Sequence, residues 1–196
     1  AVNLREDDEL AWVKLTTGDD DLLVATRDGY SIRFNENDAR PIGRTARGVK
    51  AIELKKGDEV IGMCVIREND DGKSKIMTIA ETGLGRRSET EEYRVQTRAG
   101  KGVLNYHIEK YGLVAAVDMV NDDDDVILIA SNGIIIRIAA EQINTVSRTS
   151  KGVRVMRLTD DNRVVTFTRT EHDESEEITE VEQASEEDIA ASEAEA

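Results

Sequence analysis

The sequence is poor in cysteine and histidine, the residues that build disulfides, zinc sites and Cys–His nucleophiles. Its single cysteine, Cys64, excludes an internal disulfide and fits a reducing cytoplasm, which is the compartment we expect. Its two histidines, His107 and His172, have no neighbouring ligand cluster and no Cys–His pairing. No apolar stretch approaches the roughly 20 residues that cross a bilayer. We therefore expect no catalytic residue, no metal, no cofactor and no membrane contact in this chain.

Basic charge is scarce on average, but it is unevenly distributed. The whole chain carries a net charge of −15. Of its 41 acidic residues, 12 lie in the segment 171–196, which contains no lysine or arginine. Residues 1–170 hold the other 29 acidic and all 26 basic residues, a net charge of only −3. Because segment 171–196 also has few large apolar residues, we predict that it is a disordered acidic tail.

An internal repeat organises the rest of the chain. Three segments of 45 residues align without a gap, at residues 22–66, 76–120 and 126–170. Each begins with an apolar strand, and seven residues later comes a turn glycine: Gly29, Gly83 or Gly133. Four residues further lies an arginine, and each repeat then contains the loop Arg-x-x-(Arg/Lys)-Gly-Val. Agreement at this many positions indicates three copies of one structural unit.

Each repeat is predicted to contain four short strands. In the first repeat they are expected at residues 22–27, 30–34, 49–54 and 60–66. Four strands per repeat favour an all-β, propeller-like array of four-stranded antiparallel blades. Residues 2–10 match residues 52–60, so we predict a partial blade at 1–16 and expect the chain to be a fragment of a longer protein.

Positive charge recurs at one place in every repeat. The windows 26–50, 81–104 and 131–154 hold 15 basic and 8 acidic residues, whereas the rest of 1–170 holds 11 basic and 21 acidic residues. Adjacent blades would align these windows into a basic rim. Arginine forks suit phosphate oxygens, and the loop glycine is expected to let backbone N–H groups approach them. The candidate DNA contacts are Arg33, Arg44, Arg47, Lys50, Arg86, Arg87, Arg98, Lys101, Arg137, Arg148, Lys151 and Arg154.

The Gly-x-x-x-Arg step, the Arg-x-x-(Arg/Lys)-Gly-Val loop and the segment 3–10 resemble the C-terminal domain of DNA gyrase A subunits, over residues 1–170. The resemblance implies a β-pinwheel, whose four-stranded blades exchange strands with their neighbours. It also implies a basic rim that binds and wraps duplex DNA in support of negative supercoiling. The implied parent is a bacterial type II topoisomerase that uses ATP and Mg²⁺ elsewhere. Its implied partners are the gyrase B subunit, the rest of the gyrase A subunit, and DNA.

Two alternatives stay open at this point. The Gln/Arg/Gly/Lys-rich box of the family's first blade has no match here, which leaves the A-type subunit of topoisomerase IV as a second parent. The regularity of the three repeats favours gyrase. A protein-interaction propeller without nucleic-acid binding would carry apolar or aromatic hot spots on its rim, and the rim windows contain few aromatic residues.

Overall fold

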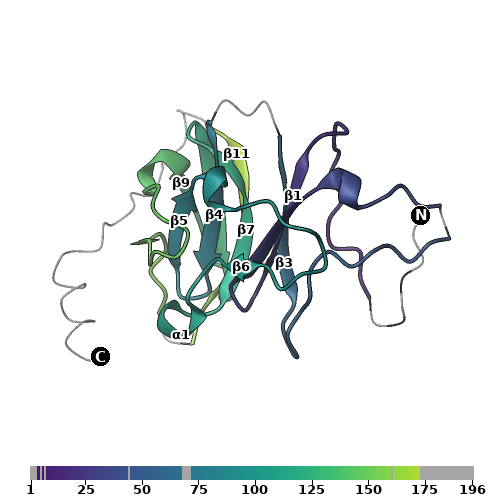
Figure 1. The fold of residues 1–196 in the computed structure, drawn as a ribbon. Helices are drawn as coiled ribbons and strands as arrows, with labels where there is room; N and C mark the ends of the chain where they lie inside the picture. The colour runs from purple at the N-terminus through teal and green to yellow at the C-terminus, as the bar shows by residue number, and fades with distance from the viewer. Residues whose placement is uncertain are drawn as a thin grey trace.

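The fold was analysed in a computed structural model that describes residues 4, 6, 8–43, 45–67, 72–159 and 161–172. Within these residues the chain is all-β, with eleven strands in three antiparallel sheets and only short helical turns between them (Figure 1). This confirms the predicted fold class. No helix in the described ranges is long and apolar enough to cross a membrane.

The first sheet is built mainly from the first repeat. Its strands β1 (Asp21–Thr26) and β2 (Tyr30–Asn35) form a hairpin, and β3 (Val60–Ile66) pairs with the other side of β1. The fourth strand, β6 (Val103–Leu104), comes from the second repeat and pairs with β2. The order in the sheet is therefore β3-β1-β2-β6.

The other two sheets follow the same plan. The second sheet has the order β10-β5-β4-β7, from β4 (Ser74–Ala80), β5 (Leu84–Ser88), β7 (Val114–Asn121) and β10 (Val153–Arg154). The third has the order β11-β8-β9, from β8 (Asp124–Ala130), β9 (Ile135–Ala139) and β11 (Val164–Glu171). The short turns are η1 (Glu36–Asp38), η2 (Thr90–Glu92), α1 (Ile108–Tyr111) and η3 (Ala140–Gln142).

The four strands of one repeat do not form one sheet, which corrects the simplest interpretation of the sequence. The third strand of each later repeat pairs with the preceding sheet, and this confirms the strand exchange that the resemblance implies. The segment 49–54, predicted as the third strand of the first repeat, is not a strand, since no preceding sheet lies within the described residues to receive it. The described residues of 1–16 likewise contain no strand of the predicted partial blade.

The three turn glycines occupy equivalent places, as predicted. The N–H of Gly29, Gly83 and Gly133 each donates to the carbonyl three residues earlier, at 3.0 Å. Their φ angles are +78°, +83° and +84°, in the left-handed region that glycine adopts without a steric penalty. The glycine of each repeat therefore closes the first hairpin of each sheet.

The core lies between the sheets. Ile76 and Met77 are neighbours on β4 and both have 0% exposure, because one faces the first sheet and the other faces the third. Strands β3, β7 and β11 pack beside one another, and an added Cβ on Gly62 would lie 2.3 Å from the carbonyl oxygen of Val117. We call the edge of each sheet formed by β3, β7 and β11 the inner edge, and the opposite edge, where β6 and β10 attach, the outer edge.

Candidate nucleic-acid interface

The predicted basic loops lie at the outer edge. The first basic loop, residues 98–102, packs along the first repeat: Ala99 N–H donates to the Ala51 carbonyl at 2.6 Å, and Gly100 O accepts from Glu53 N–H at 2.8 Å. The Arg98 guanidinium donates to the carbonyls of Asp38 and Lys50, each at 2.9 Å. Arg98 therefore joins two repeats, a structural role that charge patterning alone did not indicate.

The second basic loop, residues 146–152, packs against the second sheet. The carbonyl of Val146 accepts from Ser88 Oγ at 2.9 Å, and the carbonyl of Ser150 accepts from Arg86 Nε at 3.2 Å. The carbonyl of Lys151 accepts from the Tyr106 hydroxyl at 2.9 Å. Tyr106 lies two residues after β6, so the basic loops of the second and third repeats are neighbours along the outer edge.

The loop glycines of the second and third repeats permit strand exchange. Gly102 and Gly152 have φ angles of +75° and +82°. An added Cβ would lie 2.3 Å from Ser31 O in the first case and 2.2 Å from Gly85 O in the second. Each glycine thus lets β6 or β10 approach the strand that it joins. The equivalent Gly48 has nothing within 4 Å of an added Cβ.

The arginine four residues after each turn glycine is a connection between repeats. Arg33 Nε lies 2.8 Å from Asp21 Oδ2, and its Nη1 donates to the carbonyl of Thr90 in the next repeat at 2.9 Å. Arg87 is 5% exposed, its Nε donates to the carbonyl of Ile143 at 2.6 Å, and its Nη1 pairs with Asp122. Arg33 and Arg87 thus connect the first and second sheets to the 3-10 turn region of the following repeat.

Arg137, the third arginine of this set, fixes the third sheet. It lies 2.8 Å from the fully buried carboxylate of Asp125 and donates to the Glu171 carbonyl at 3.0 Å. His172 Nδ1 is 2.8 Å from the other oxygen of Asp125. Burial raises the pKa of Asp125, but the hydrogen bonds from His172 and Arg137 outweigh it, so the pKa lies below its ordinary value.

This cluster predicts how stability changes at low pH. Because the folded pKa of Asp125 is depressed, its contribution is complete above the unfolded value of about 3.9 and is lost as pH falls through the folded value. Asp125→Asn removes the titrating group. We expect the free energy of unfolding of the wild type to fall more steeply than that of the variant below about pH 4. Denaturant titrations over that range measure the difference, and parallel curves would rule out the contribution.

The predicted contacts divide into accessible and inaccessible groups. The exposed or half-buried members of the predicted set are Arg47, Lys50, Arg98, Lys101, Arg148, Lys151 and Arg154. The prediction of a phosphate contact is wrong for Arg86 and Arg87, which are buried, and it is set aside for Arg33 and Arg137, whose guanidinium groups bind protein oxygens. Arg44 and residues 173–196 of the predicted tail lie outside the described residues. Glu171, the predicted start of that tail, belongs to β11.

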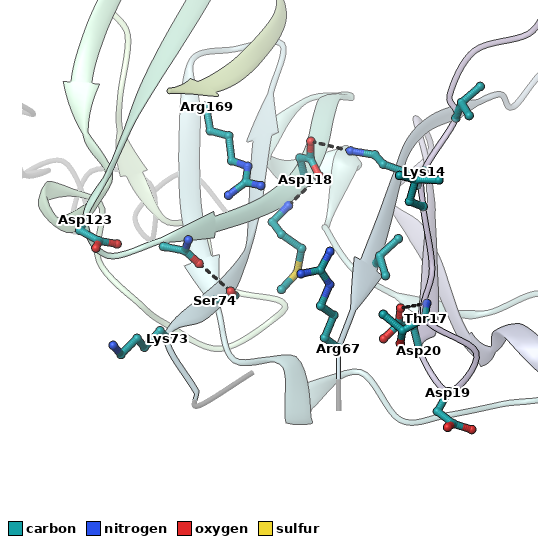
Figure 2. Close-up of a pocket in the computed structure, with 15 residues that line it drawn as sticks. Lys14, Thr17, Asp19, Asp20, Arg67, Lys73, Ser74, Asp118, Asp123 and Arg169 are labelled. Atoms are coloured by element: carbon teal, nitrogen blue, oxygen red, sulfur yellow. Dashed lines mark hydrogen bonds and ion pairs between the residues drawn. The ribbon is translucent and has the colours of Figure 1, made fainter. Parts of the chain in front are cut away.

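A hollow of about 870 Å³ lies near the ends of the inner-edge strands (Figure 2). Its charge can be compared with that of the basic loops. Its charged lining is Lys14, Asp19, Asp20, Arg67, Lys73, Asp118, Asp123 and Arg169. Four cations and four anions balance each other here, and Lys14 and Asp118 form an ion pair at 3.5 Å. The described residues include no His/Cys/Asp/Glu group arranged to hold a metal ion. This hollow lacks the excess positive charge that phosphate binding requires.

The comparisons with known proteins agree with the repeat architecture. A family described as DNA gyrase C-terminal domain, beta-propeller, matches residues 20–66, 74–121 and 124–171. The chain belongs to this family. Each match covers one repeat and contains one hairpin together with its inner-edge strand.

Two relatives of this gyrase-family chain are A subunits of DNA gyrase. The protein from Lawsonia intracellularis is 42% identical over 168 residues, which is 85% of this chain and 20% of the relative. The protein from Staphylococcus aureus is 39% identical over 185 residues, which is 94% of this chain and 21% of the relative. The chain spans about a fifth of the length of these relatives.

Solved structures share the fold. The crystal structure of a DNA topoisomerase IV C-terminal domain has a TM-score of 0.79 at 27% identity and covers 87% of this chain and 52% of that chain. The structure of a DNA gyrase A C-terminal domain has a TM-score of 0.74 at 22% identity and covers 86% of this chain and 56% of that chain. At that identity the second likeness concerns the fold alone.

Proposed function

We propose that the outer edge of this domain binds the phosphate backbone of duplex DNA without sequence preference and wraps the duplex. The domain would act within the A subunit of a DNA gyrase in the bacterial cytoplasm, with the gyrase B subunit supplying the ATP-dependent part of negative supercoiling. The two gyrase relatives support this parent protein. The ATP and Mg²⁺ sites of the parent would lie outside this chain.

One observation carries the proposal. Arg47, Lys101 and Lys151 are equivalent residues of the three repeats, and each is exposed or half-buried. Lys101 and Lys151 lie in loops at the outer edge, and Arg47 lies three residues before Lys50, whose carbonyl accepts from Arg98. The neighbouring repeats touch through Arg98 and Tyr106, so these cations follow one another along the array. A row of cations at regular spacing suits a polymer with regular negative charge. Contacts to phosphates alone fix the position of a duplex and carry no direct sequence information.

The A-type subunit of topoisomerase IV is a second candidate parent, and the higher TM-score of the topoisomerase IV domain supports it. Both parents require the same outer edge to bind DNA, so they differ only in the enzyme that uses it. A protein-interaction propeller is less well supported, since Tyr93 and Tyr106 are buried in the core and the exposed Trp12 lies outside the basic windows, although Val95 and Ile135 are exposed within them.

The test removes the equivalent cations together. We expect R47A/K101A/K151A to weaken binding to three unrelated duplexes by about tenfold to a hundredfold at low salt, equally on all three. The matched control K56A/K73A/K110A removes the same charge from exposed lysines outside the basic loops, and its effect should stay within about threefold because distant charges are screened. Equal losses for the two variants, or no binding by the wild type, would contradict the proposal.

A further inference from the structure

The two junctions between repeats hold their basic loops in different ways. At the first junction the loop is held by its own arginine, because Arg98 donates to two carbonyls of the first repeat. At the second junction the equivalent residue is Arg148, and its Nε and Nη1 are buried without a hydrogen-bond partner. The loop there is instead held by hydrogen bonds from Arg86 and Ser88 on β5 of the second sheet. The inference that follows rests on the proposed function of the outer edge.

The second sheet carries a buried polar network where its neighbours are apolar. Its members are Thr78 on β4, Arg86 and Ser88 on β5, and Asn105, which follows β6 of the first sheet and reaches across to Arg86 and Thr78. The equivalent residues of the first repeat are Val24, Ile32, Phe34 and Ala51. Those of the third repeat are Leu128, Ile136, Ile138 and Val155. The fold does not require the network, because apolar side chains fill the same positions in the first and third repeats.

Arg86 is the centre of this network. It is fully buried, and its described acceptors are hydroxyl, amide and carbonyl oxygens, with no carboxylate among them. Two of these acceptors are the carbonyls of Arg148 and Ser150, while Ser88 donates to the carbonyl of Val146. Alternate carbonyls of the second basic loop thus point into the sheet, toward the buried cation.

This arrangement links the guanidinium groups of Arg86 and Arg148 through Tyr93 and Asn105. Arg148 lies over the ring of Tyr93, 5.9 Å from its centroid, and the Tyr93 hydroxyl shares Asn105 Oδ1 with Arg86. The carboxylate of Glu92 is engaged by the backbone N–H of Arg148 at 2.6 Å and by Ser147 Oγ. Buried nitrogens without a partner are costly, and turning outward to an anion would satisfy them. The positive charge of Arg86 beneath the loop adds to the attraction.

We propose that Arg148 is the main phosphodiester contact of the outer edge, and that Arg86 is a positioning residue that holds its loop and frees its side chain. Arg86 itself does not reach DNA. Arg98, whose guanidinium already binds two carbonyls, contributes mainly to the junction between repeats. DNA bound along the array is therefore held most tightly between the second and third repeats.

The experiment compares the two arginines and then tests their dependence on Arg86. We expect R148A to weaken duplex binding about tenfold and R98A about twofold, since Arg98 already uses two donors on carbonyls, whereas Nε and Nη1 of Arg148 are buried without a partner. In the R86I background the effect of R148A should shrink to about twofold, whereas the effect of K101A should be unchanged, because coupling is confined to residues in contact. The Arg148 Nε–Hε signal in NMR spectra should shift on addition of DNA.

The residues equivalent to Arg86 in the first and third repeats are Ile32 and Ile136, so R86I installs a side chain that this position holds elsewhere in the array. If R86I does not fold, T78V/R86I/S88F/N105A installs the complete apolar set of the first repeat. Equal effects of R148A and R98A, an R148A effect that is the same in both backgrounds, or an Arg148 signal that DNA does not move would each overturn the inference. Wild-type protein that does not bind DNA would overturn the proposed function itself.

Discussion

Gly83→Ala is expected to destabilise the domain by about 3 kcal/mol or more, whereas Gly133→Ala should cost only about 1 kcal/mol. The two glycines have nearly identical φ angles, +83° and +84°, so the backbone penalty of a Cβ is the same for both. Their surroundings differ. An added Cβ at Gly83 would lie 2.2 Å from the carbonyl oxygen of Met156 in the following repeat, and at Gly133 it would meet nothing within 4 Å.

The difference between the two variants isolates the packing of one repeat on the next. The third sheet receives no strand within the described residues, so its turn glycine has no neighbour to meet. Urea denaturation followed by circular dichroism would give both free energies of unfolding. Equal losses would show that the penalty comes from φ alone and that the close approach of Met156 does not contribute.

Arg87→Met is expected to cost about 2–4 kcal/mol, because it leaves the carbonyls of Ile143 and Glu141 without the guanidinium that donates to them. The ion pair itself should matter little. The side chain of Asp122 is 59% exposed, so Asp122→Asn should cost less than about 1 kcal/mol. Arg87→Lys should not restore stability, since a single ammonium cannot replace the planar fork that donates to Ile143 O and pairs with Asp122.

Arg154→Met is the matched control, because Arg154 is exposed on β10, which pairs with β5 in the same sheet. It should change stability by no more than about 0.5 kcal/mol. Thermal and urea unfolding of the four variants would rank them. A loss for Arg87→Met as small as that for Arg154→Met would show that this arginine is not a connection between repeats.

The sequence was sufficient to predict the repeat, the hairpins and the inner-edge strands. Hairpins form within one repeat, so the local alternation and the turn glycines at 29, 83 and 133 are enough to place them. The partner of the third strand was not predictable in this way. Residues 103–104 and 153–154 join the preceding sheet, and nothing in their own sequence distinguishes that pairing from one within the repeat.

The candidate binding surface was only partly predictable for a related reason. Charge patterning located the basic loops correctly, but it treated every recurrent arginine as exposed. Arg86 and Arg87 are adjacent on β5 and both are buried, because neighbouring sheets cover both faces of the middle sheet. Alternation of polar and apolar residues along a strand predicts one exposed face, and this prediction fails for β5, which is buried on both faces. Comparing equivalent positions would have found Arg86, since the other repeats have isoleucine in its place.

The salt dependence of DNA affinity tests the central claim most directly, because released counterions count the phosphates that the outer edge neutralises. Plotted as log affinity against log salt, the slope should be less steep for R47A/K101A/K151A than for the wild type by about 2.7, which is about 0.9 for each lost contact. The slope of K56A/K73A/K110A should match that of the wild type. If all three proteins have the same slope, the equivalent cations of the outer edge do not contact DNA, and the account is wrong.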